Sequence, residues 1–246
     1  MSFGLAKKRD LDDAPGVIGI APHELLPLPD NLLSDPKAGW RDPRTWFKYP
    51  ELPLEIEIGC GKGGFLLQEA GANTRTNFLG MENAKEFYYY AADRVRRRSL
   101  GNVRMLCADA TEFLRWRCAP EVARVVHLYY SDPWPKAKHH KHRVVQDRYL
   151  ADVWRILTPG GQLRVVTDHD ELWAWCTEHF DRWCRSNGPI PAAAKTDVEL
   201  PAQPFDLARF TPPTWAEEGA VVGTNYERKF TGADKPPHAC VLIKRA

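Results

Sequence analysis

Carboxylates recur where predicted strands end. Five apolar runs alternate with amphipathic stretches, and each run ends in, or lies next to, an acidic residue. These residues are Glu57, Glu82, Asp109, Asp132 and Asp168. In an open parallel sheet the ligand crevice lies outside the carboxyl ends of the strands, so the five acids are expected to converge on one edge. Taken singly, each is equally well read as a helix cap or a loop acid. Together they predict a binding site.

A glycine-rich turn follows the first acid and opens a predicted helix. The turn contains Gly59, Gly61 and Gly63, whose lack of a Cβ lets the backbone approach a ligand closely. The turn also satisfies G-x-G-x-x-G, and Glu82 lies near the distance where a dinucleotide-binding fold keeps its ribose-binding acid. A nicotinamide-dependent dehydrogenase is therefore a competing interpretation.

The order of the acids favours S-adenosylmethionine over a dinucleotide. Glu57 precedes the glycines, where its carboxylate can accept from the amino group of a methionine moiety. Glu82 can accept from both ribose hydroxyls, and Asp109 from the exocyclic amine of adenine, in charge-assisted hydrogen bonds. Acids also suit a cationic sulfonium, whereas they would repel a pyrophosphate. The predicted cofactor is S-adenosyl-L-methionine.

A rigid segment follows the fourth predicted strand. It reads Asp-Pro-Trp-Pro-Lys from Asp132 to Lys136, and its two prolines restrict the backbone around one carboxylate and one indole. An ionised Asp132 only accepts hydrogen bonds, and the Watson–Crick edge of guanine offers it two donors. That orientation leaves N7 of the base on the opposite side, facing the methyl group. Trp134 would stack on the base or wall the pocket.

The segment continues into a basic run without acidic residues. Its cations can contact phosphates, in binding that would weaken steeply with salt, and its histidines add donors. The cations are Lys136, Lys138, Lys141 and Arg143, and the histidines are His139, His140 and His142. A solvated loop is the alternative interpretation. A metal site built from the three histidines is disfavoured because the neighbouring lysines oppose a cation, so no metal is predicted.

The elements that must position these residues follow from the alternation of apolar and amphipathic stretches. Such alternation predicts an α/β fold with a mostly parallel twisted sheet and helices on both faces. The expected strands are 54–58, 77–82, 103–109, 124–132 and 161–168, and the expected helices are 63–71, 84–99, 111–118, 143–157 and 170–186. Residues 188–222 read as a long surface loop, followed by a closing antiparallel hairpin of 224–231 and 238–244.

Length and composition set outer limits on the fold. The chain has 246 residues, of which 43% are hydrophobic, and this suits a partly irregular N-terminal arm over 1–50 and one domain over 51–246. The net charge of +2 is small, so nucleic-acid binding must come from local basic clusters. The six cysteines form no C-x-x-C pair. No apolar signal or membrane-spanning run is evident, which predicts a cytoplasmic protein without a membrane partner.

These motifs resemble, in order, those of the bacterial tRNA (guanine-N7-)-methyltransferases. The resemblance covers about residues 52 to 230, and its most specific parts are the Asp132–Lys136 block with its basic tail and the Thr-Asn-Tyr-Glu stretch at 224–227. It implies a Rossmann-like S-adenosylmethionine-dependent methyltransferase that acts on a variable-loop guanine of tRNA, position 46 in that family. This chain departs from the family at His142, where an arginine is usual, and at Val222 and Gly223, where Arg-Pro is common.

The resemblance also implies roles for individual residues. The positions that match cofactor contacts are Glu57, Gly59, Gly61, Gly63, Glu82, Asp109, Ala110 and Asp132, with Asp132 also at the reaction centre. The positions that match substrate contacts are Lys136, Arg143, Asp168, Thr224, Asn225, Tyr226 and Glu227. The expected partner is tRNA, and the protein is expected to be a monomer or a homodimer.

Guanine N7 carries a lone pair and no proton, so this reaction needs no general base. Catalysis is expected to come from alignment of N7, the methyl carbon and sulfur. The alternatives are a methyltransferase acting on a different RNA or a small molecule, and an RNA-binding module without catalysis.

Overall fold

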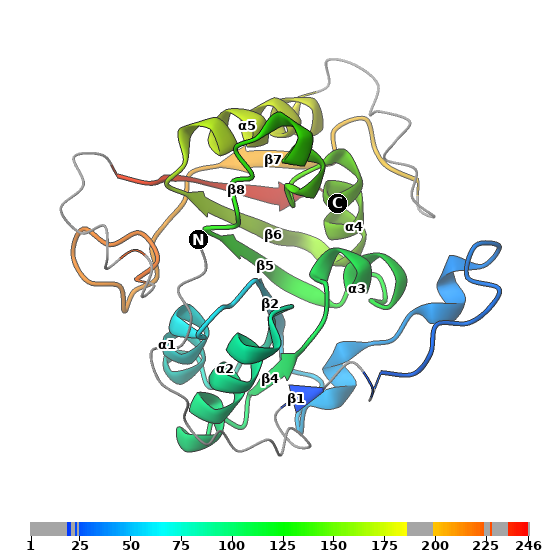
Figure 1. The fold of residues 1–246 in the computed structure, drawn as a ribbon, viewed down its shortest axis with the longest axis vertical. Coiled ribbons are helices and arrows are strands. Elements are labelled where there is room, and N and C mark those ends of the chain that lie inside the picture. The colour runs from blue at the N-terminus through cyan, green and yellow to red at the C-terminus, as the bar shows by residue number, and fades with distance from the viewer. Residues whose placement is uncertain are drawn as a thin grey trace.

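The protein folds around a central twisted sheet. The computed structural model describes residues 19–20, 23, 25–185, 199–223, 227 and 236–245. Within these residues the sheet has eight strands in the order β1-β4-β3-β2-β5-β6-β8-β7 (Figure 1). The strands are β1 (Gly19–Ile20), β2 (Leu54–Ile58), β3 (Asn77–Met81), β4 (Val103–Leu106), β5 (Ala123–Tyr129), β6 (Leu157–Thr167), β7 (Phe205–Ala208) and β8 (His238–Lys244).

The strands from β1 to β6 pair in parallel, as the alternation of strands and helices predicts. Parallel neighbours need crossover connections, and five α-helices of the described chain supply them or cover the sheet. These are α1 (Gly64–Ala72), α2 (Lys85–Arg97), α3 (Ala110–Trp116), α4 (Asp147–Ile156) and α5 (Asp170–Cys184). The predicted α/β class is therefore confirmed.

Helices cover both faces of the sheet, which explains why β2 is buried along its whole length. On one face, Ile56 packs in a cluster that includes Phe113 of α3, Leu150 of α4 and Phe180 of α5. The opposite face is covered near β3 and β4 by side chains of α1 and α2. A third apolar cluster on that face joins Phe65 of α1 to residues around β5, β6 and β8.

The C-terminal strand pair is antiparallel, as expected, but its first strand lies elsewhere in the sequence. β8 pairs antiparallel with both β6 and β7. β7 lies inside 188–222, which the sequence predicts to be a loop, and the expected strand 224–231 lies outside the described residues except for Glu227. β7 is short and its two central residues are exposed, so it lacks the apolar alternation that marks a strand.

One other expectation needs correction. The helix predicted over 143–157 begins at Asp147, because Arg143 adopts an extended conformation at the end of a 3-10 helix, η5 (Ala137–His142). The N-terminal arm contributes β1, which pairs with β4, and Leu26, whose carbonyl accepts a hydrogen bond of 2.6 Å from Arg117. In the part of the chain that the structure describes, no helix is both long and apolar enough to cross a membrane.

Candidate active site at the carboxyl edge of the sheet

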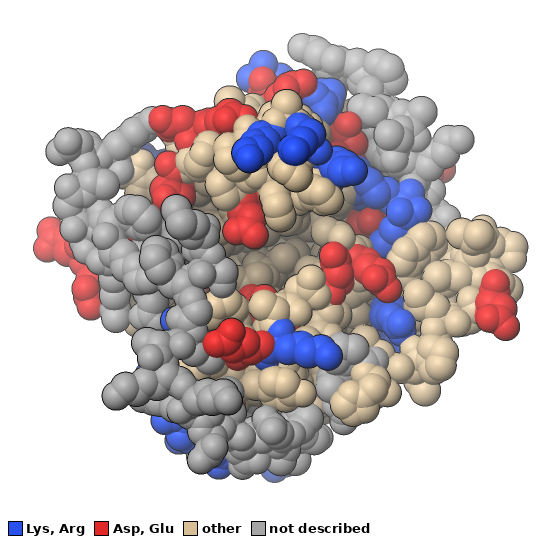
Figure 2. Space-filling model, viewed as in Figure 1, with Lys and Arg blue, Asp and Glu red and all other residues tan. Residues whose placement is uncertain are grey.

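The direction in which successive strands are added to the sheet reverses between β2 and β5. The acidic residues predicted to form the site lie at or just beyond the ends of strands on both sides of this point. The chain runs from β2 outward through β3 and β4, and from β5 outward to β6. A crevice forms outside the carboxyl ends of strands at such a switch point. Figure 2 shows a hollow in the centre of the side of the molecule drawn in Figure 1, with acidic side chains around it and Lys and Arg side chains gathered above it.

The glycine turn lies between β2 and α1 and leaves space in front of its backbone. Gly59 and Gly61 have φ values of 69° and 52°, and a Cβ built on either would meet no atom within 4 Å. Both the left-handed backbone and the open space suit glycine. The turn is anchored to β3, since the amide of Gly59 donates to the carbonyl of Met81 over 2.9 Å. The turn therefore presents open backbone on a fixed support.

Two glutamates of β2 share one face of the strand, but among the described residues only Glu55 pairs with positively charged or imidazole side chains. Glu55 accepts from Arg124 over 2.5 Å and from His127 over 2.8 Å. Glu57 is 5% exposed, and its Oε2 has no hydrogen-bond partner among the described residues. A buried carboxylate oxygen without a donor costs free energy, so Glu57 is suited to a donor that a ligand brings.

Burial raises the pKa of Glu57 from its ordinary value of 4.5 to about 8, and repulsion from Glu82 contributes. By contrast, the pKa of Glu55 is lowered, because its hydrogen bonds to His127 and Arg124 outweigh its burial. A carboxyl group with a strongly raised pKa beside an open glycine turn is typical of a functional position. A bound ammonium group would favour its ionised form.

Glu82 and Asp109 lie at the ends of the next two strands. Glu82 accepts from the amide of Gly61 over 2.9 Å and from that of Ala84 over 2.8 Å, so its carboxylate is fixed beside the glycine turn. Asp109 caps α3, because its Oδ1 accepts from the amides of Thr111 and Glu112. Among the described residues no hydrogen bond reaches its Oδ2. The cap orients the Asp109 carboxylate without using both of its oxygens.

A cleft of about 270 Å³ lies beside Asp109. Its lining includes Leu25, Asn83, Ala108 and Phe113, none of which the sequence analysis singled out. The apolar surfaces of Leu25 and Phe113 suit a flat heterocycle such as adenine, and the charged side chains of Lys85, Glu112 and Arg117 also line the cleft. Asn83 could have been predicted from its position directly after Glu82. Leu25 reaches the cleft from the N-terminal arm, and no local sequence pattern indicates this contact.

The segment that follows β5 has a strained backbone. Tyr130 and Trp134 adopt φ values of 53° and 44°, in the left-handed region that bulky residues rarely occupy. Trp134 also precedes Pro135, which restricts it further. Asp132 is exposed, while Trp134 is half-buried beside His139 and His142. Strain of this kind costs on the order of 1–3 kcal/mol per residue and concentrates at functional sites.

Arg143 does not face solvent, contrary to the expectation of a phosphate contact. It is 2% exposed, and its guanidinium bonds the carbonyl of Pro133 and the carboxylate of Glu171. A phosphate cannot reach a cation enclosed in this way. In sequence Arg143 adjoins the exposed lysines, whereas its partners Pro133 and Glu171 are more distant along the chain. No local pattern therefore indicates that Arg143 is buried.

The rest of the basic run is on the surface. Lys136, Lys138 and Lys141 are exposed, and all three belong to or adjoin η5. In Figure 2, Lys and Arg side chains gather over the place where Figure 1 draws this segment, next to α5. Asp168, at the end of β6, is also exposed. The expected substrate side of the site therefore combines a carboxylate edge with a cationic surface.

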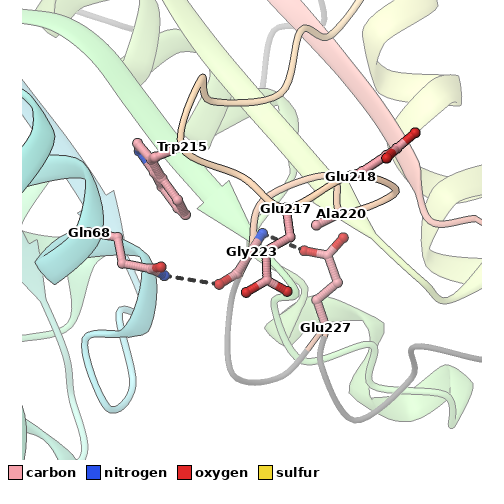
Figure 3. A pocket seen from close by; sticks show the side chains of 7 residues that line it. All are labelled: Gln68, Trp215, Glu217, Glu218, Ala220, Gly223 and Glu227. Carbon is pink, nitrogen blue, oxygen red and sulfur yellow. Dashed lines mark hydrogen bonds between the residues drawn. The ribbon is translucent and has the colours of Figure 1, made fainter.

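Glu227 holds a loop together. Its carboxylate accepts from the backbone amides of Val221, Val222 and Gly223, the latter two over 2.9 and 2.7 Å. Gln68 of α1 donates to the carbonyl of Gly223 over 3.1 Å, which ties this loop to α1 (Figure 3). Glu227 is 8% exposed. Its geometry thus favours organising the loop, while a substrate contact stays a prediction, and residues 224–226 lie outside the described residues.

Comparisons with known proteins match this arrangement. Residues 51–189 match the family model described as "Putative methyltransferase". The chain is 37% identical to the tRNA (guanine-N(7)-)-methyltransferase of Nitrobacter hamburgensis over 85% of this chain and 78% of that protein. The chain belongs to this family. The protein of the same name from Staphylococcus aureus is 36% identical over 76% of this chain and 77% of its own length.

Among solved structures, a 16S rRNA methyltransferase, KamB, is similar to this methyltransferase with a TM-score of 0.49 and 14% identity, over 89% of this chain and 94% of that one. The residues matched by the family model, 51–189, contain the glycine turn and the acids from Glu57 to Asp168. In the described residues, no group of three His, Cys, Asp or Glu side chains is arranged to hold a metal ion.

Proposed function

We propose that this protein transfers a methyl group from S-adenosyl-L-methionine to N7 of a guanine in tRNA. The observation that carries the proposal is Glu57, a buried carboxylate with an unpartnered oxygen next to an open glycine turn. That combination fits the amino acid end of the donor, and family membership adds the reaction and the substrate class. Because the substrate is tRNA, we expect the protein to act in the bacterial cytoplasm.

The residues present fit the donor along its length. Glu57 would accept from its ammonium group, and the open backbone at Gly59 and Gly61 would let the methionine chain pass closely. Gly63 packs toward Ala91 of α2 and would not contact the donor through open space. Glu82, fixed by two backbone amides, would accept from the ribose hydroxyls. When bound, the donor supplies an electrophilic methyl group on a positively charged sulfur.

The adenine end would lie in the cleft beside Asp109. Oδ2 of Asp109 would accept from the exocyclic amine, and the backbone of Ala110, the first residue of α3, would complete the contact. The apolar lining from Leu25 and Phe113 would cover the ring faces. Carboxylate acceptors make the hydrogen bonds to amine and hydroxyl donors stronger than neutral acceptors would.

The chain's own residues are proposed to act on the base by positioning it. Asp132 would accept from the N1–H and the exocyclic amine of guanine, which turns N7 toward the methyl group. No proton has to leave N7, so the reaction is accelerated by alignment and by the fixed negative charge that offsets the cation formed on the base. Extrusion of the base from its stack costs a few kcal/mol.

The surface outside the carboxylate edge would bind the rest of the tRNA. Lys136 and the neighbouring cations of η5 are exposed and can contact phosphates. Asp168 and the segment Thr224–Glu227 are proposed to close the pocket on the other side of the base. The variable-loop guanine at position 46 is the proposed target.

Mass analysis of nucleosides tests this function. Unmodified tRNA transcript is incubated with the protein and methyl-labelled donor, then digested. We expect labelled 7-methylguanosine, which disappears when the transcript carries adenine at position 46. Labelled nucleosides other than 7-methylguanosine would contradict the proposed chemistry, and labelled 7-methylguanosine from the adenine transcript would contradict the proposed position.

A further inference from the structure

The segment 131–135, which carries Asp132, makes few hydrogen bonds of its own. Pro133 and Pro135 have no backbone N–H to donate. Outside helices and strands, no backbone-to-backbone hydrogen bond among the described residues involves any position from 131 to 135. Trp134 is nevertheless held at a φ of 44°. A strained conformation persists only if its surroundings impose it, so something other than the segment must do so.

Arg143 supplies the hydrogen bonds that reach this segment in the described part of the chain. Its Nε donates to the carbonyl of Pro133 over 2.9 Å, and its Nη2 approaches the carbonyl of Trp134 at 3.4 Å. The same Nη2 donates to Oε1 of Glu171 over 2.7 Å. The guanidinium also lies 5.2 Å from the ring centre of Trp175.

The partners of Arg143 on the other side, Glu171 and Trp175, are held in place by α5. Glu171 lies in the first turn of α5, where the helix dipole favours an acid. Arg143 holds the pKa of Glu171 below its ordinary value. The ring of Trp175, also in α5, is fixed by a hydrogen bond of 2.7 Å to the carbonyl of Val145. Arg143 therefore connects the segment to a helix that packs on the sheet.

We propose that Arg143 is a positioning residue, which clamps the Asp132–Pro135 segment to α5 through Glu171 and so sets where Asp132 meets the base. The inference rests on the proposed function, because it concerns the reaction that Asp132 supports. Arginine suits the task since its planar fork bonds Pro133 and Glu171 at once, whereas lysine would offer a single ammonium without the Nε donor. The clamp explains why a cation within a basic run is buried.

Two variants test the clamp. Arg143→Lys keeps the charge but loses the fork, and Glu171→Ala removes the anchor at a half-exposed position while leaving Arg143 in place. Displacement of a reacting group by about 1 Å costs up to roughly 100-fold, so we expect kcat at saturating tRNA to fall about 10- to 100-fold in both variants. The dissociation constant of S-adenosylhomocysteine should change far less than kcat, because Glu57, Glu82 and Asp109, which would hold the donor's ammonium, ribose and adenine, lie at or beyond the ends of β2, β3 and β4.

Arg155→Lys is the matched control. Arg155 is also 2% exposed, donates to the carbonyls of Leu114 and Cys118, and lies over the ring of Trp40. It sits near the beginning of β5, away from the carboxyl edge, so its replacement should lower the melting temperature as Arg143→Lys does but spare kcat.

The outcomes separate the possibilities. A fall in kcat confined to the Arg143 and Glu171 variants supports the clamp. Wild-type kcat in Glu171→Ala, or an equal loss in Arg155→Lys, overturns it, and Glu171→Ala decides the question if Arg143→Lys does not fold. A wild-type protein that forms no 7-methylguanosine refutes the proposed function instead, which is a different result.

Discussion

The affinity for the donor's amino acid end should depend on pH through Glu57. This carboxyl group must be ionised to accept from an ammonium at full strength, yet burial raises its pKa to about 8. Glu82, which directly follows β3, and Glu69 of α1 also raise it, and the backbone amide of Leu66 opposes the shift. At neutral pH the free protein therefore carries Glu57 mostly protonated, and binding must release that proton.

The size of the effect follows from the fraction ionised. With a pKa of about 8, about 1% of the free protein carries the carboxylate at pH 6 and about half at pH 8, so the apparent dissociation constant should fall about 50-fold across this range. Stability should change in the opposite sense. Because the folded pKa lies above the ordinary 4.5, the contribution of Glu57 to stability is present below pH 4.5 and is lost as pH rises through 8.

Isothermal titration of S-adenosylhomocysteine, which shares the amino acid end, measures the affinity at pH 6, 7 and 8 in buffers of different ionisation enthalpy. Glu57→Gln is the control, because glutamine keeps an acceptor and the shape but cannot titrate. We expect a flat profile for the variant, no proton release on binding, and thermal unfolding that is less sensitive to pH between 5 and 8. A wild-type affinity that is equally flat, or a variant that retains the slope, would refute the reasoning.

Three further predictions concern single side chains. Asp132→Ala should lower kcat by at least about 100-fold, as measured by single-turnover methylation at saturating donor and tRNA; turnover near the wild-type value would contradict the assignment. Lys136→Ala should weaken tRNA binding and reduce the slope of log affinity against log salt by about 1, checked by filter binding across a salt series, with an unchanged slope counting against a phosphate contact. Asp109→Ala should lose about 1 kcal/mol of stability with the α3 cap, whereas Asp109→Ser should keep the cap, and both should bind S-adenosylhomocysteine more weakly in the same titration. Equal affinity in the serine variant and the wild type would restrict Asp109 to capping.

Much of the candidate site could be predicted from local sequence. β2 is expected and found at Leu54–Ile58, because apolar residues alternate there with two glutamates directly before a glycine turn, and a period of two predicts a strand. Glu57, Glu82 and Asp109 follow three neighbouring strands of the sheet, so their order along the chain predicts a shared edge. The topology of parallel strands turns positions in sequence into neighbours in space.

The tertiary structure decided what each polar side chain does there. Glu55 and Glu57 are two residues apart on one strand, yet only Glu55 meets an arginine and a histidine, which come from β5 some 70 positions later. Arg143 belongs by sequence to an exposed basic run, but it is buried and pairs with Glu171, 28 residues away. Local sequence patterns determine which segments form apolar strands and which form turns. Partners of buried charges depend on long-range packing, because a buried charge is stable only where a distant residue or a ligand supplies its counterpart.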